Sequence, residues 1–254
     1  MKALAIFAVI PFALLSAHEN NGRGTKAIAL ANAFVACSDN AWAISYNPAG
    51  LTKLTSPQIS AFFVPQQFGV PELRTVSLSG AYNTNVGTVA ALVEQFGFDL
   101  YRTTEIGLGY GLSLDTMISV GATVNGERIA IGRYGAAQSF TLDIGFLGNP
   151  FANVDIGFCW KNVSAATIGI NRERLPQYLL FGICYTPFDD FCLVSELEKD
   201  LRFPAVFKAG VEQRFFGFLS LRCGVANNPD KFSAGLAVQY STVEFGYAGY
   251  SHGP

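Results

Sequence analysis

The chain has 254 residues, of which 50% are hydrophobic, 13% are aromatic and only 14% are charged. Soluble proteins carry about 25% charged residues on average, so this chain is poor in charge, and its mean hydropathy is +0.29. A net charge of −2 without any Lys/Arg cluster provides no basic surface and excludes a nucleic-acid partner.

A secretory signal peptide is predicted at residues 1–17. Lys2 supplies a positive start, residues 3–15 form an apolar run, and Ser16-Ala17 provides a small-residue cleavage site. The apolar run is shorter than the ~20 residues that a membrane-spanning helix needs. We therefore expect an exported chain that begins at His18.

Residues 18–56 form the one stretch of the exported chain that does not alternate between apolar and polar residues. The stretch is rich in alanine, passes through Asp39 and Asn40, and reaches the turn sequence Asn47-Pro48-Ala49-Gly50. Pro48 fixes φ and Gly50 permits a positive φ. Because small side chains fit a confined space, we expect this stretch to sit as a plug inside a barrel formed by residues 57–254. Asp39 and Asn40 could help to hold a cation, although a capping or turn role is favoured.

After this stretch the sequence alternates with the period of a β-strand. In residues 105–114, bulky apolar residues occupy every even position from Ile106, and Gly107, Gly109 and Gly111 lie between them. Successive strand residues point to opposite faces. Thirteen strands are predicted in this way, at residues 58–64, 73–82, 87–98, 105–114, 118–126, 137–147, 152–163, 177–186, 190–199, 204–216, 218–226, 231–241 and 242–250.

Two all-β architectures explain such strands. In a soluble sandwich the apolar face points into the core, whereas in an outer-membrane barrel it points toward lipid. The opposing faces are rich in Gly, Ala and Ser and carry charges of both signs, which suits a crowded lumen better than a water-facing surface. We therefore predict an antiparallel transmembrane β-barrel with a lumen charge network of Lys208, Glu212, Arg214, Arg222 and Glu244.

The predicted strand count is odd, although single-chain bacterial barrels use even numbers. A barrel of about 14 strands is the expectation, which would place one more strand after Pro254 unless the count of thirteen is short by one. The connections are short, and none is long enough for a large extracellular cap.

The five cysteines are Cys37, Cys159, Cys184, Cys192 and Cys223. Their spacing is not that of a metal site. Cys184 and Cys192 flank a predicted turn and could pair across a hairpin, while the alternative is that all five are small residues packed in strands.

Catalytic and cofactor chemistry is not indicated. His18 and His252 are the two histidines and lie near the chain ends, so a His-based triad or metal centre is not expected. The sequence Gly22-Arg23-Gly24 follows no hydrophobic strand and therefore does not fit a dinucleotide loop. We expect a non-enzymatic protein with no cofactor.

A family resemblance adds to these patterns. Residues 33–51 read AFVACSDNAWAISYNPAGL and resemble the N-terminus of the FadL-type outer-membrane transporters, and more closely their shorter relatives, the PorV/PorQ family. Residues 210–212, 219–224, 228–235 and 245–252 are similar to the closing hairpins of PorV/PorQ proteins. The matches cover both ends of the chain and leave the middle supported by periodicity.

The resemblance implies a barrel of about fourteen strands, plugged by an N-terminal segment that Asn47, Pro48 and Ala49 anchor to the inner wall, with Asp39, Asn40 and Gly50 in the same motif. Family members usually continue past the position of His252 into a last strand. The chain also lacks the long extracellular loops of the fatty-acid transporters.

Two functions follow for an outer-membrane protein of this kind. The preferred reading is a PorV/PorQ-type barrel whose rim docks proteins of a secretion or surface-assembly system. The alternative is a FadL-like channel for hydrophobic or small solutes, gated by residues 22–51, in which deletion of residues 25–50 raises permeability. The expected partners are outer-membrane lipid and either secretion-system proteins or a hydrophobic small molecule. A soluble exported β-protein and a lipid-modifying enzyme remain as minor alternatives.

Overall fold

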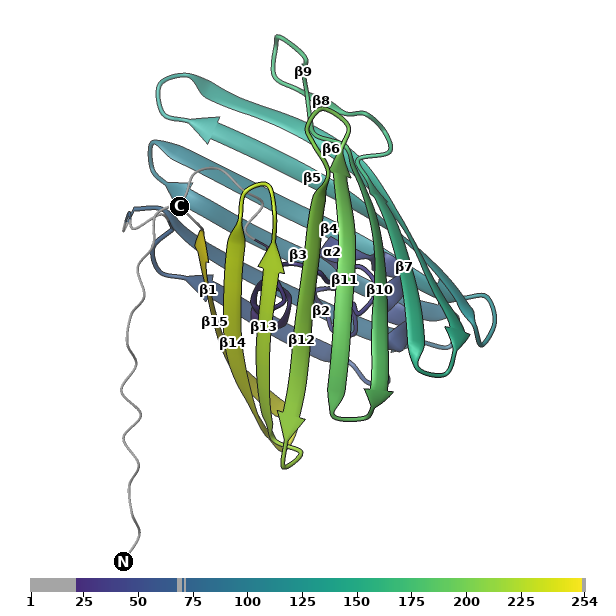
Figure 1. The fold of residues 1–254 in the computed structure, drawn as a ribbon. Helices are drawn as coiled ribbons and strands as arrows, with labels where there is room; N and C mark the ends of the chain where they lie inside the picture. Colours follow the sequence, from purple (N-terminus) through teal and green to yellow (C-terminus); the bar gives the residue numbers. More distant parts are fainter. Residues whose placement is uncertain (1–21, 68–69, 71, 253–254) are drawn as a thin grey trace, which may run out of the picture.

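The structure is a computed structural model that describes residues 22–67, 70 and 72–252. The predicted signal peptide and His18 therefore lie outside the described residues. One large sheet dominates the chain (Figure 1). Its strands are β1 (Gln58–Val64), β2 (Arg74–Thr84), β3 (Gly87–Phe98), β4 (Tyr101–Ser113), β5 (Ile118–Ile131), β6 (Gly135–Phe151), β7 (Val154–Lys161), β10 (Tyr178–Phe188), β11 (Phe191–Asp200), β12 (Val206–Phe215), β13 (Leu219–Ala226), β14 (Lys231–Tyr240) and β15 (Val243–His252).

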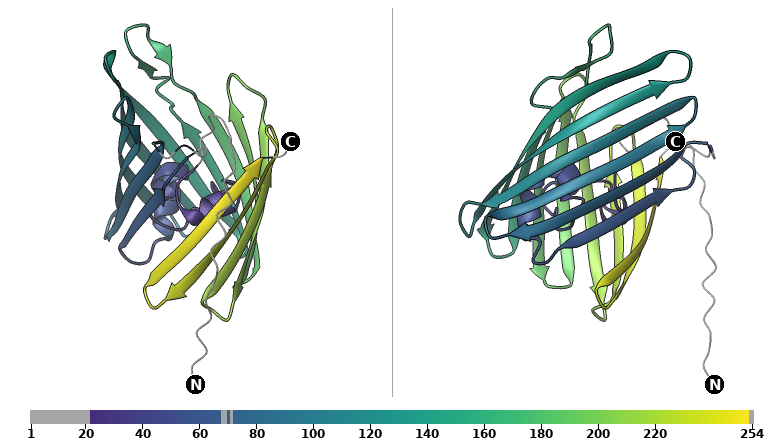
Figure 2. Two further views of the ribbon diagram at one scale, coloured as in Figure 1. Left: turned by 90° about the vertical axis from the view of Figure 1, so that its left-hand side faces the viewer. Right: turned by 180° about the vertical axis from the view of Figure 1, so that it is seen from behind.

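The sheet is an antiparallel meander in which each strand pairs with its neighbours in sequence. The order runs β1-β2-β3-β4-β5-β6-β7-β10-β11-β12-β13-β14-β15, which gives 13 strands. The thirteen predicted strands therefore all form, and the all-β barrel-type fold is confirmed. The sheet curves around a central space, and the two terminal strands, β1 and β15, are not paired with each other (Figure 2).

The two faces of the strands differ as the alternation predicts. In β4, Ile106 and Leu108 are 57% and 65% exposed on the outer face, while Gly107 and Gly109 are buried on the inner face. Phe140 in β6 and Phe245 in β15 are likewise about 70% and 69% exposed. A soluble sandwich buries its large apolar side chains. This sheet presents them outward, which is the arrangement of a membrane barrel.

Residues 22–57, here called the inner segment, lie on the concave side of the sheet (Figure 2). The inner segment contains α1 (Thr25–Ala29), α2 (Ala43–Tyr46) and the 3-10 helix η1 (Pro48–Lys53). Its apolar side chains form most of the buried core, with Phe34, Leu30 and Leu51 completely buried. No helix within the described part of the chain is both long and apolar enough to cross a membrane.

The two ends of the curved sheet carry different connections. At one end, here called the short-turn end, the connections have two to four residues and include residues 152–153 and 189–190. At the opposite, long-loop end, residues 162–177 join β7 to β10 and contain the small hairpin β8 (Thr167–Ile168) and β9 (Glu173–Arg174), which rises above the sheet in Figure 1. The sequence pattern predicted a plain connection at this place and missed the hairpin.

Candidate functional site

The candidate site is the interior of the curved sheet, where the inner segment separates two cavities. The larger cavity has a volume of about 650 Å³ and opens at the long-loop end, while the smaller, of about 140 Å³, lies at the short-turn end. Asn32 and Tyr46 of the inner segment line the larger cavity, and Cys37 and Lys53 line the smaller one. Any path through the interior therefore passes the inner segment.

Glycines on the inner face of the wall bring the inner segment close to the sheet backbone. A Cβ atom added to Gly109 would lie 2.8 Å from Ile44 Cγ1, and one added to Gly121 would lie 2.5 Å from the Ala49 nitrogen. Gly111, Gly121 and Gly145 are direct neighbours across β4, β5 and β6. A larger residue at these positions would occupy the space that the inner segment fills. The bare strand faces in the sequence thus correspond to a contact surface.

Glu196 on β11 holds the centre of the inner segment. Its side chain is 1% exposed, and its Oε2 accepts hydrogen bonds from the backbone nitrogens of Phe34 at 2.9 Å and Val35 at 2.8 Å. Lys208 on β12 neutralises this carboxylate at 2.9 Å and reaches Glu198 at 2.7 Å. A buried charge needs both a partner and hydrogen bonds, and Glu196 has both.

Arg23 joins the start of the inner segment to two other strands. Its guanidinium pairs with Glu94 on β3 at 2.7 Å and also with Glu105 on β4. Burial alone would disfavour the charge, but Glu105 and Glu94 outweigh it and hold the pKa of Arg23 well above its usual value. The Arg23 backbone nitrogen donates to the Tyr46 hydroxyl at 2.7 Å, and burial raises the pKa of Tyr46.

Four of the five residues in the predicted lumen charge network are members of two ion-pair groups. Lys208 belongs to the Glu196 group, while Glu212 pairs with Arg222 at 3.3 Å and Arg222 with Glu244 at 3.5 Å. Lys26 of the inner segment also reaches Glu212, at 3.2 Å. Arg214 lines the smaller cavity at the short-turn end, where its side chain is exposed and forms no ion pair within the described part of the chain.

Asn47 lies between the inner segment and the wall. It is completely buried, and its Nδ2 donates to the carbonyl oxygens of Val35 at 2.8 Å and of Phe146 on β6 at 3.0 Å. Its Oδ1 accepts from the Ala49 nitrogen at 3.2 Å and caps η1, which begins at Pro48. These contacts place Asn47, Pro48 and Ala49 against the wall.

Gly50 differs from the expectation, while Asp39 and Asn40 make local contacts. Gly50 does not adopt a positive φ. A Cβ at that position would instead lie 2.6 Å from the Ser38 Cβ, so close packing requires the glycine. Asp39 pairs with Lys26 at 2.6 Å and Asn40 accepts from the Trp42 nitrogen at 3.0 Å. Both therefore make these contacts within the inner segment, and Asn40 has the turn role that the sequence favoured.

The larger cavity combines apolar and charged groups. Its apolar lining comes from Tyr178 and Leu180 on β10 and from Phe203, Pro204 and Val206 at the β11–β12 connection. Lys161, Glu198, Asp200, Arg202 and Lys231 add charges around this surface. A volume of about 650 Å³ is within the ~300–1,000 Å³ range of small-molecule sites, and the lining suits a ligand with an apolar body.

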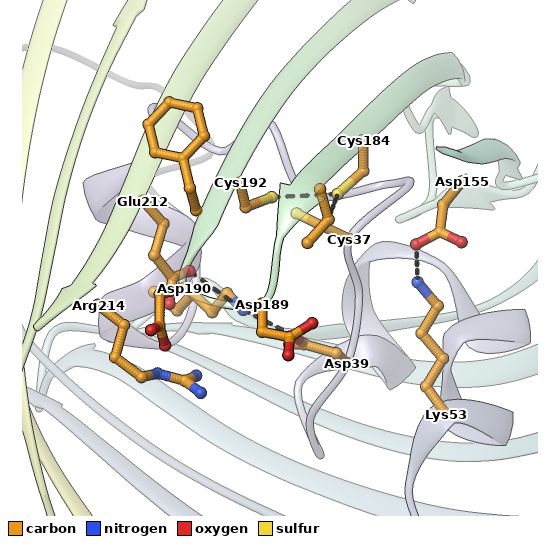
Figure 3. A pocket seen from close by; sticks show the side chains of 13 residues that line it. Cys37, Asp39, Lys53, Asp155, Cys184, Asp189, Asp190, Cys192, Glu212 and Arg214 are labelled. Atoms are coloured by element: carbon orange, nitrogen blue, oxygen red, sulfur yellow. Dashed lines mark hydrogen bonds and ion pairs between the residues drawn. The ribbon is translucent and has the colours of Figure 1, made fainter. Parts of the chain in front are cut away.

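The smaller cavity lies where the inner segment meets the β10–β11 turn (Figure 3). Lys53 pairs with Asp155 on β7 at 2.5 Å on one side of it. Lys26 lies on the other side, and although burial alone would lower the pKa of Lys26, Asp39 and Glu212 outweigh burial and raise it. Cys37, Cys184 and Cys192 line the same cavity. Within the described residues, no group of three or more His, Cys, Asp or Glu side chains is arranged to hold a metal ion.

The sequence reasoning missed Arg23 and its two carboxylates. Glu94 and Glu105 are direct neighbours on β3 and β4, which a two-residue turn at Asp99 and Leu100 joins. Two like charges facing each other are destabilising unless a cation lies between them. The hairpin of these two strands places Glu94 opposite Glu105, and this would have indicated a buried cation between them.

No protein-family model matches this sequence, and no curated protein sequence matches it either. Solved structures with the same fold are found. The CymD monoaromatic hydrocarbon channel is 14% identical, with a TM-score of 0.64, over 93% of this chain and 94% of that one. The toluene transporter TbuX of Ralstonia pickettii is 11% identical, with a TM-score of 0.58, over 91% and 96%. A FadL homologue of Pseudomonas aeruginosa is 12% identical, with a TM-score of 0.59, over 89% and 88%.

At this level of identity the likeness establishes the fold alone. The fold is that of FadL-type outer-membrane channels, and these neighbours are channels and transporters rather than enzymes. The comparisons do not support the PorV/PorQ assignment or the secretion role attached to it. Of the two sequence-based readings, the alternative, a FadL-like channel, is the one whose fold these neighbours share.

Proposed function

We propose that this protein is an outer-membrane channel for small hydrophobic molecules and that its inner segment controls passage. The single observation that carries the proposal is the position of the inner segment between a larger, partly apolar cavity and a smaller cavity at the opposite end. The outward apolar side chains support a location in a bilayer. Short turns face the periplasm in barrels of this kind, so the larger cavity opens to the cell exterior.

The larger cavity is the entry site in this proposal. Tyr178, Leu180 and Phe203 provide the surface for an apolar solute. Because charged side chains also line the cavity, it admits a wider range of solutes than a narrow, purely apolar tunnel would. The neighbours named above include channels for toluene and monoaromatic hydrocarbons, which makes labelled toluene a suitable first test compound.

The experiment measures initial uptake of labelled toluene by cells with a lipopolysaccharide outer membrane that lack their own FadL-type channel. We expect uptake above that of cells with empty vector. Ala226→Trp, which fills part of the larger cavity, should return uptake to the vector level. Val225→Trp, at the neighbouring outward position that is 45% exposed, is the matched control and should leave uptake unchanged.

A heat-dependent shift in gel mobility establishes folding for each variant before uptake is compared. Folded wild-type protein that takes up no more toluene than the vector control, or equal uptake by both tryptophan variants, would overturn the entry-site proposal. Secretion loss in the source cell on deletion of the gene, with toluene uptake unaffected, would revive the secretion reading.

A further inference from the structure

Three cysteine side chains from separate parts of the chain meet at the smaller cavity. Cys37 belongs to the inner segment, Cys184 to β10 and Cys192 to β11, and Figure 3 shows the three side chains pointing toward one another. The sulfurs of Cys184 and Cys192 are 3.1 Å apart, and the Cys37 thiol also interacts with the Cys184 sulfur. All three are present as free thiols in this structure and pack in one cluster.

Cys184 is the shared member of this cluster. A disulfide bond is about 2.05 Å long, so the Cys184–Cys192 pair needs a movement of only about 1 Å in its side chains. A bond from Cys184 to Cys192 would close a loop within one hairpin and leave the inner segment unattached. A bond from Cys184 to Cys37 would instead join the inner segment to the wall.

The other two cysteines supply a comparison within the same molecule. Cys159 on β7 is completely buried, and Cys223 on β13 is exposed. Among the described residues, neither has a sulfur of another cysteine within hydrogen-bonding distance. Packing explains the buried Cys159. Packing alone does not explain why three thiols from three elements converge beside a cavity.

We propose that Cys37, Cys184 and Cys192 form a thiol–disulfide switch that fixes or releases the inner segment. In the oxidising step, two protein thiols lose two protons and two electrons to a small-molecule disulfide such as oxidised glutathione, which becomes two thiols. In the exchange step, the thiolate of the third cysteine attacks the bond at Cys184, and the displaced cysteine leaves as a thiolate. The exchange step involves no net oxidation.

The cluster offers a route for this chemistry. Cys192 is only partly buried and lines the cavity, so a reagent meets it first. Burial raises the pKa of the Cys37 thiol, so Cys37 is mostly protonated and attacks a disulfide only through its small thiolate fraction. Compartments outside the cytoplasm are oxidising, which is where an outer-membrane protein would meet such reagents.

Bond mapping on the folded, full-length protein tests the switch. The Cys192→Ser variant, treated with oxidised glutathione, should form a Cys37–Cys184 bond, and the Cys37→Ser variant should form a Cys184–Cys192 bond. In the Cys184→Ser variant, Cys37 and Cys192 should both remain open to alkylation. Cys159→Ser and Cys223→Ser are matched controls and should leave the bond pattern of the wild type unchanged.

The two hairpin cysteines lie on one tryptic peptide, because no Lys or Arg occurs between Arg174 and Lys199. A second digestion at aspartate separates them at Asp189 and Asp190, and cleavage at Asp39 isolates the Cys37 peptide. Mass spectrometry of the unreduced peptides then identifies each bond. Folded Cys192→Ser protein in which both remaining cluster cysteines stay alkylatable would overturn the proposal.

The consequence for passage rests on the proposed channel function. Oxidised Cys192→Ser protein should lose toluene uptake to the vector level and regain it with dithiothreitol, whereas oxidised Cys37→Ser protein should transport normally. Bond formation without any change in uptake would overturn the control of passage by the switch. If wild-type protein transports nothing, the channel proposal fails, and the bond map still decides whether the switch exists.

Discussion

The inner and outer faces of the same strands have opposite surroundings. On the outer face of β4, Leu108 is 65% exposed and contacts little of the protein, so its environment is the surrounding medium. On the inner face one residue further on, Gly109 has no side chain and lies against Ile44. The outer face is thus defined by what surrounds the molecule, and the inner face by how closely one segment of the same chain approaches it.

The inner face also differs in how it uses charge. Charged residues on the inner wall pair with the inner segment or with each other, as Glu196, Lys208 and Arg222 do. Large apolar residues dominate the outer face of the same strands. Variants that alter one face at a time should therefore have separable effects on the free energy of unfolding.

Replacing Glu196 with alanine should have the largest effect. The variant leaves two backbone nitrogens of the inner segment without their acceptor and removes a partner of Lys208. Breaking a buried ion pair in this way costs about 3–5 kcal/mol. Urea unfolding of the protein in vesicles, followed by loss of the heat-dependent gel shift, measures it. Leu197→Val, on the outer face of the same strand, should stay within about 0.5 kcal/mol; equal losses for the two variants would contradict the contrast between the faces.

Replacing Leu108 with arginine tests what the outer face meets. In the middle of a lipid-facing band, an arginine costs about 2–4 kcal/mol, and near the interface about 0–1 kcal/mol. Leu114, which directly follows the last residue of β4 and is 60% exposed, provides the matched position for Leu114→Arg. The same unfolding assay should separate the two variants. Unchanged stability in both would mean that water, not lipid, covers this face.

Replacing Gly121 with alanine should have the smallest of the three effects. The new Cβ would overlap the Pro48 carbonyl carbon and the Ala49 nitrogen, and overpacking of this kind costs about 1–3 kcal/mol. Gly249→Ala is the control, because nothing lies within 4 Å of a Cβ at that position. If the two alanines have the same unfolding midpoint, the inner segment does not rest on the glycines of the wall.

Much of the fold could be predicted because a period of two specifies strands and faces directly. The strand at residues 87–98 has the observed bounds, and the bare face around Gly107 and Gly109 is the one that the inner segment covers. The size of the residues in the inner segment was also informative, since alanines such as Ala29 and Ala33 are fully buried against the wall.

The periodicity could not predict which polar residues meet. Alternation places Arg214 on the same face as Glu212, but it does not show that Lys26 and Arg222 pair with Glu212 while Arg214 forms no ion pair among the described residues. The thiol cluster could not be predicted, because it depends on where Cys37 lies along the wall. That position is set by how residues 22–57 fold and not by the strand period. The β8–β9 hairpin rests on pairs of two residues, which are too short to produce an alternating pattern.

The glycine face of the wall has a consequence for selectivity in the proposed channel. At the level of Gly111, Gly121 and Gly145, the wall presents backbone rather than side chains to the interior. A filter needs side chains that can be larger, smaller or differently charged, and along these three strands the inner segment supplies them. In the proposed channel, the preference for one solute over another can therefore change through substitutions in the 36 residues 22–57 of the inner segment, while these glycines stay the same.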